Sequence, residues 1–114
     1  MDELDRLAAE VDEKVVAWFR QIHQNPELPN REVATSRLVA DHLRELGFDE
    51  VMTGVAGHGV VAVLRGRGHG DRVVGLRADM DALPIRERQD LPYRSTRIDE
   101  DYPGGPLPVA HMCG

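Results

Sequence analysis

The hydrophobic residues of this chain change their spacing at Gly47, and this change restricts the fold more than any other feature of the sequence. Before Gly47, apolar residues recur every three or four positions, which is the spacing of an amphipathic helix. After Gly47, short runs rich in β-branched residues appear, and such runs favour strands. The sequence therefore predicts helices first and a sheet afterwards, which is an α/β fold class.

Two helices are expected before Gly47. The first should end at Asn25, because Pro26 disfavours helical geometry in the residue before it. Its apolar stripe consists of Leu4, Leu7, Ala8, Val11, Val15, Trp18, Phe19 and Ile22. The second is expected over residues 31–46, with Asn30 as its cap and Gly47 in the left-handed closing conformation. Its buried stripe would consist of Val33, Ala34, Leu38, Leu43 and Leu46.

Three strands are expected after the helices, over residues 48–53, 59–65 and 72–78. A turn rich in glycine separates the last two strands. Parallel strands need a longer crossover, so this short connection predicts an antiparallel hairpin. The expected architecture is two helices followed by a β-hairpin-containing sheet. From Leu83 onward, prolines and a Gly-Gly pair predict an extended loop, which is uncommon in a compact domain unless the loop serves a site or the domain is incomplete.

The length and composition exclude several classes of protein. The chain has 114 residues, of which 41% are hydrophobic, and this is enough for one domain with a packed core. The net charge of −6 argues against a nucleic-acid partner. A single cysteine cannot form an intrachain disulfide, and no apolar run is long enough to cross a membrane. The acidic start does not resemble a signal peptide, so we expect a cytoplasmic protein.

Asp79 and Asp81 are the first candidate site residues. They follow the expected strand 72–78, and residues two apart in a strand point to the same side. Two carboxylates so placed repel each other unless a cation or hydrogen-bond donors lie between them. The alternative is that both are solvated acids in a turn after the strand.

His111 and Cys113 are the second candidate pair. Imidazole and thiolate suit zinc and neighbouring transition metals, but zinc usually takes about four ligands. The alternative is a buried free cysteine beside a capping histidine. The remaining histidines, His23, His42, His58 and His69, are each expected to be structural or exposed.

Four stretches of the chain together resemble one enzyme family. They are residues 19–28, 43–48, 76–85 and 110–114, and the Arg-Ala-Asp-Met-Asp-Ala-Leu-Pro sequence in the third is the most specific. In this order they strongly resemble the amino-terminal part of the metal-dependent amidohydrolases typified by hippurate hydrolase, N-acyl-amino-acid amidohydrolases and auxin-conjugate hydrolases. The resemblance covers nearly the whole chain.

The resemblance implies a hydrolase that uses two divalent metal ions (Zn, Mn, Co or Ni) to cut the amide bond of N-acyl amino acids. It implies that Cys113 is a metal ligand, that Asp81 supports the metal centre from behind, and that Asp79 is the other acid of the stretch. In the family the sequence continues past the position of Gly114 with His-Asp. The general base, further ligands and an inserted smaller domain lie beyond that point. Residues 1–114 are therefore expected to be the amino-terminal part of a catalytic domain, inactive alone.

Two other functions remain open at this stage. The chain could be a non-catalytic module that works by association, because missing sheet neighbours would expose strand edges and apolar helix faces. We therefore expect a homo-oligomer. A small zinc-binding domain built from Cys113, His111 and another histidine is the third possibility.

Overall fold

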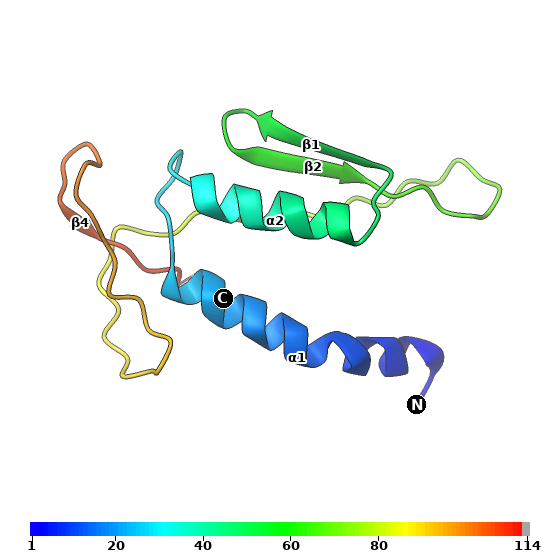
Figure 1. Cartoon of the computed structure of the whole chain (residues 1–114), viewed down its shortest axis with the longest axis horizontal. Helices are drawn as coiled ribbons and strands as arrows, with labels where there is room; N and C mark the ends of the chain where they lie inside the picture. Colours follow the sequence, from blue (N-terminus) through cyan, green and yellow to red (C-terminus); the bar gives the residue numbers. More distant parts are fainter. Residues whose placement is uncertain (113–114) are drawn as a thin grey trace. The chain divides into compact units, whose positions relative to one another are not determined.

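The computed structural model describes residues 1–112, which form two compact units. One unit consists of Met1–Pro26 with Leu83–Gly114, and the other of Glu27–Ala82. The elements are α1 (Glu3–Gln24), α2 (Val33–Glu45), β1 (Glu50–Val55), β2 (Gly59–Val63), β3 (Ile98–Asp99) and β4 (Leu107–Pro108) (Figure 1). The expected α/β class, with two helices and a β-hairpin, is confirmed.

Helix α1 begins with a reciprocal cap. The Asp5 amide donates to the Asp2 carboxylate at 2.8 Å, and the Asp2 amide donates to the Asp5 carboxylate at 3.2 Å. These bonds occupy amides that have no partner inside the helix. The helix ends at Gln24, next to Asn25, as predicted. Its apolar stripe is not buried, and Leu4 and Phe19 are 74% and 57% exposed.

Helix α2 begins two residues later than predicted, and Asn30 does not cap it. Asn30 has a φ of 63°, in the left-handed region, whereas a capping residue is normally extended. The residue at the cap position, Glu32, makes no side-chain bond to the helix. The carboxylate of Glu27 replaces that cap: it accepts the amide of Ala34 at 3.1 Å and the amide of Thr35 at 2.6 Å.

The buried face of α2 consists of small residues. Thr35, Ser36 and Ala40 are buried and let the helix lie close to β1 and β2. The predicted stripe is therefore wrong in part: Leu38 and Leu43 are half-buried, but Val33, Ala34 and Leu46 are exposed. The left-handed conformation predicted for Gly47 is confirmed, with a φ of 78°.

The sheet of this unit is a different hairpin from the predicted one. Strand β1 pairs with β2 in antiparallel register, with Glu50 opposite Val63, and a three-residue turn joins them. The predicted strand over residues 72–78 does not form, and Val73 and Leu76 are 92% and 96% exposed. Gly75 lies in the middle of residues 72–78 and weakens a strand there, because glycine has no side chain to pack. Residues 72–78 therefore remain extended without a partner strand.

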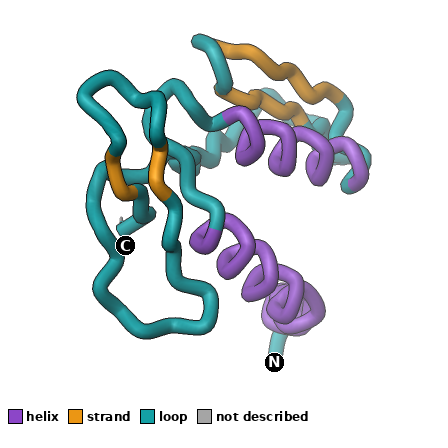
Figure 2. Tube along the Cα trace, turned by 60° about the vertical axis from the view of Figure 1, so that its left-hand side comes forward, coloured by secondary structure: helices purple, strands orange, loops and turns teal. Residues whose placement is uncertain are grey.

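The loop predicted after Leu83 contains two short pairings (Figure 2). Strands β3 and β4 pair in antiparallel register, and Leu83 forms a bridge with Ala110 through bonds of 2.9 and 3.0 Å. Gly105 allows a close turn here, because a Cβ at this position would lie 2.8 Å from the Tyr102 carbonyl oxygen. Val109 and Ala110 form the buried centre of this unit.

We predict that Glu27→Gln lowers the free energy of unfolding by about 1–3 kcal/mol, since the substitution removes a buried charge-assisted cap. Urea unfolding followed by circular dichroism measures the change. Glu32→Gln is the matched control, because Glu32 occupies the cap position without a side-chain bond. Equal losses in the two variants would contradict the role given to Glu27.

Candidate functional site

The segment that carries Asp79 and Asp81 is extended but is not a strand. Asp79 forms an ion pair with Arg77, with 2.9 Å between Oδ1 and Nη2, and the two side chains are 36% and 87% exposed. Such exposed pairs contribute little to stability. The prediction that both acids face one point at the end of a strand is not supported, because the strand that would orient them is absent. Asp79 fits the alternative of a solvated acid.

Asp81 lies in a better anchored position. Its side chain is half-buried, and the next residue, Ala82, is 2% exposed. The Ala82 amide donates to the main-chain carbonyl of Glu27 at 2.8 Å. The end of the extended segment is therefore fixed to the residue that caps α2, and Asp81 is positioned by this backbone contact.

Of the second candidate pair, His111 and Cys113, the structure describes only His111. His111 is half-buried and follows Ala110, whose bridge to Leu83 fixes the backbone before it. Cys113 lies outside the described residues. Within residues 1–112, no three histidine, cysteine, aspartate or glutamate side chains are grouped so that they could hold a metal ion.

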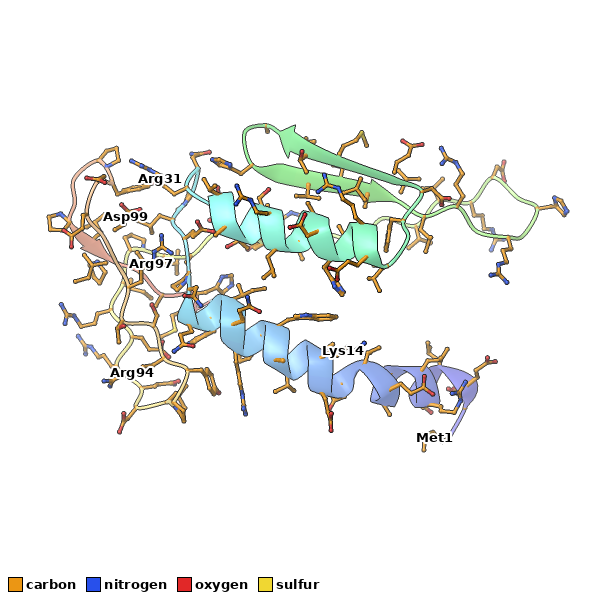
Figure 3. All side chains as sticks on the ribbon, viewed as in Figure 1. Met1, Lys14, Arg31, Arg94, Arg97 and Asp99 are labelled. Carbon is orange, nitrogen blue, oxygen red and sulfur yellow. The ribbon has the colours of Figure 1, made fainter. Side chains whose placement is uncertain are left out.

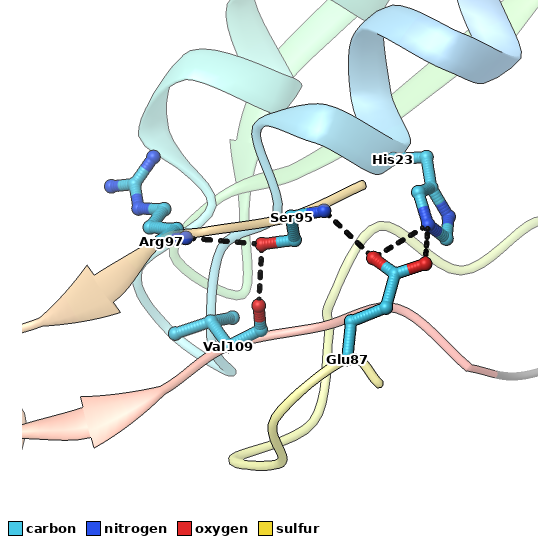
Figure 4. A network of polar contacts seen from close by, with 5 residues as sticks. All are labelled: His23, Glu87, Ser95, Arg97 and Val109. Atoms are coloured by element: carbon cyan, nitrogen blue, oxygen red, sulfur yellow. Dashed lines mark hydrogen bonds and ion pairs between the residues drawn. The ribbon is translucent and has the colours of Figure 1, made fainter. Parts of the chain in front are cut away.

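A buried polar network lies at the end of α1, and the sequence did not predict it. His23 Nε2 lies 2.9 and 3.0 Å from the two carboxylate oxygens of Glu87, whose side chain is fully buried (Figure 4). The Ser95 amide donates to the same carboxylate at 2.7 Å. The Ser95 hydroxyl donates to the Val109 carbonyl at 2.6 Å and accepts the Arg97 amide at 3.3 Å. The network joins α1 to two distant parts of the loop that follows Leu83.

The environment of Glu87 keeps its carboxylate ionised. Burial raises its pKa, but the hydrogen bond from the Ser95 amide, the hydrogen bond and charge of His23, and the charge of Arg94 together outweigh that effect. The net result is a pKa below the ordinary value of 4.5. The rings of Phe19 and Tyr93 pack on His23, each with its centroid 5.7 Å from the His23 ring.

This network does not have the arrangement of a nucleophilic catalyst. In a triad, the hydroxyl would bond to the histidine, whereas the Ser95 hydroxyl donates to a main-chain carbonyl. The Ser95 amide, and not its hydroxyl, meets Glu87. His23 is bonded to Glu87, which agrees with the expectation of a structural or exposed histidine, and Glu87 holds the loop against α1.

No local sequence pattern predicted that Glu87 and Glu27 would be buried and hydrogen-bonded. Glu87 stands in the charged run 86–90, which reads as a solvated surface, and its partners are 64 and 8 residues away. Glu27 is six residues before the first residue of α2, outside the usual range for a capping residue.

Comparison with known proteins identifies relatives over most of the chain. This chain is 46% identical over 94 residues (82% of this chain) to hippurate hydrolase of Campylobacter jejuni. It is 43% identical over 118 aligned residues to thermostable carboxypeptidase 2 of Saccharolobus solfataricus, and 39% identical over 113 residues to N-acyl-L-amino acid amidohydrolase of Geobacillus stearothermophilus, which cover 100% and 99% of this chain. Over most of its length the chain is therefore similar to part of the amidohydrolases typified by hippurate hydrolase. No family model matches it.

This relationship confirms the resemblance drawn from the four sequence stretches, and the named relatives are enzymes. The chain spans only 22%, 27% and 28% of the length of these three relatives. Within residues 1–112, no helix has the length and apolar composition needed to cross a membrane.

We predict that Glu87 makes stability dependent on acid pH. Its pKa is lowered by folding, so its contribution is present above the unfolded pKa, near 4.5, and is lost as the pH falls through the lower folded value. The free energy of unfolding should therefore fall between roughly pH 5 and pH 3, and less steeply in Glu87→Gln. Urea unfolding at several pH values measures this difference.

The exposed Glu100 provides the control for this experiment. Glu100→Gln should leave the pH dependence of unfolding unchanged. If Glu87→Gln and the parent chain have the same pH dependence, Glu87 does not have the role described.

Proposed function

We propose that this chain is the amino-terminal part of the catalytic domain of a metal-dependent amidohydrolase that cleaves N-acyl amino acids of the hippurate type. The observation that carries the proposal is the 46% identity to hippurate hydrolase, together with 39% identity to an N-acyl-L-amino acid amidohydrolase. A cytoplasmic location and a small N-acyl amino acid as partner belong to the same proposal.

The proposal gives each candidate residue a defined role. Cys113 is a metal ligand, Asp81 supports the metal centre from behind, and Asp79 is the adjacent acid. The anchored backbone beside Asp81 supports this assignment, because a residue that orients ligands must itself be held in place. Zn, Mn, Co and Ni are the candidate ions, and two are expected in a complete site.

A chimera tests the proposal most directly. This chain replaces the matching part of Campylobacter jejuni hippurate hydrolase, and release of glycine from hippurate is measured with each of the four metals. We expect the chimera to be active and chelation to abolish that activity. The isolated chain should not approach about 1 turnover per second.

Three variants of the chimera separate the assigned roles from general damage. Cys113→Ser and Asp81→Asn should each lower metal affinity or activity by about 10–100-fold. Asp71→Asn, which changes an exposed acid at the start of the same extended segment, should have little effect. If all three variants behave alike, the site assignment is wrong.

A non-catalytic association module is the second candidate function, and the exposed segment 72–78 favours it. Val73, Val74 and Leu76 are 85–96% exposed on a stretch with no strand partner, which is a surface suited to pairing with a second copy of the chain. On this alternative, a folded chimera would be inactive, and the isolated chain would form a homo-oligomer in sedimentation that Val74→Lys disrupts.

A further inference from the structure

A cavity in the unit formed by Met1–Pro26 and Leu83–Gly114 is lined by an excess of positive charge. Its volume is about 330 Å³, which is within the range of small-molecule sites. Arg86, Arg94 and Arg97 line it, and Glu87 is the carboxylate among its described lining residues. Three positive charges against one negative charge form a basic site in a chain whose net charge is −6.

The carboxylate in this cavity offsets one of the three arginine charges and leaves an excess of positive charge. The side chain of Glu87 is fully buried and accepts bonds from His23 and from the Ser95 amide. Arg94 reaches Asp90 only at 3.4 Å, and Asp90 is 99% exposed, so this contact is weak. The remaining positive charge at the cavity favours an anion from solution.

Arg97 is held by a fixed backbone. Its amide donates to the Ser95 hydroxyl, which itself donates to Val109, while its side chain extends away from that bond (Figure 4). Arg94 and Arg97 come from the same short stretch before β3 (Figure 3). The buried network thus positions the stretch that carries two of the three arginines.

The rest of the lining is apolar. Ile98, Pro108 and Val109 contribute hydrocarbon surface. An inorganic oxyanion would leave this surface unused, whereas each methylene that a ligand buries against it strengthens binding by about fourfold. The planar guanidinium group also matches the two oxygens of a carboxylate.

We propose that this cavity is a binding site for a small organic carboxylate with a short hydrocarbon chain. Its recognition elements are the guanidinium groups of Arg86, Arg94 and Arg97 and the apolar surface of Ile98, Pro108 and Val109. The inference does not depend on the proposed hydrolase activity, because Asp79 and Asp81 do not line the cavity.

The test is a titration of the isotopically labelled chain, followed by NMR at constant ionic strength. Hexanoate is the main probe, and acetate, 1-hexanol and inorganic phosphate are the comparisons. We expect saturable shifts at residues 86, 94–98 and 108–109 with hexanoate, and weaker binding with the other three probes. Arg97→Gln should weaken hexanoate binding by about tenfold or more.

Arg88→Gln is the matched control, since Arg88 is an exposed arginine in the same loop that does not line the cavity. It should change hexanoate affinity less than about twofold. The proposal is overturned if hexanoate gives no saturable shifts, if phosphate binds more tightly than hexanoate, or if both arginine variants weaken binding equally.

Discussion

A carboxylate that is removed from water must be surrounded by hydrogen-bond donors, and this requirement shapes both units of the chain. Glu27 is 4% exposed and accepts two amides and the Thr35 hydroxyl at the start of α2. Glu87 is 8% exposed and accepts His23 and the Ser95 amide at the end of α1. In each case one acid fixes the end of a helix to a segment that has little regular structure of its own.

The apolar interior of the described residues is small, which makes these polar contacts more important. Leu28 and Val109 are the largest fully buried side chains, whereas the stripe of α1 and residues 73–76 carry apolar groups in solvent. A domain of this size normally buries more of its hydrophobic residues. The two polar networks therefore carry much of the burden of holding each unit together.

The sequence predicted those parts of the fold that depend on local patterns. The end of α1 at Gln24 and the left-handed Gly47 follow from Pro26 and from the absence of a side chain at residue 47. The pairing of the strands could not be predicted in the same way. β-Branched residues occur in 48–53, 59–65 and 72–78 alike, so local composition does not show which of these segments pair.

The same distinction between local patterns and long-range contacts applies to the candidate site. Its motif identified the enzyme family, because Asp79, Asp81 and Cys113 stand in a specific local sequence. The Glu87 network joins residues 23, 87, 95 and 109, and no local pattern connects positions so far apart. The basic cavity depends on that network, because the network holds the backbone of Arg97 beside an apolar surface.

Amide hydrogen exchange of Thr35 and Ser95 tests most directly whether the two carboxylates organise the two units. The amide of Thr35 donates to Glu27, and the amide of Ser95 donates to Glu87. In Glu27→Gln, protection of the Thr35 amide should fall by about tenfold or more while that of Ser95 stays unchanged, and Glu87→Gln should give the opposite result. Unchanged protection of both amides in both variants, or equal loss at both amides in either variant, would contradict this account.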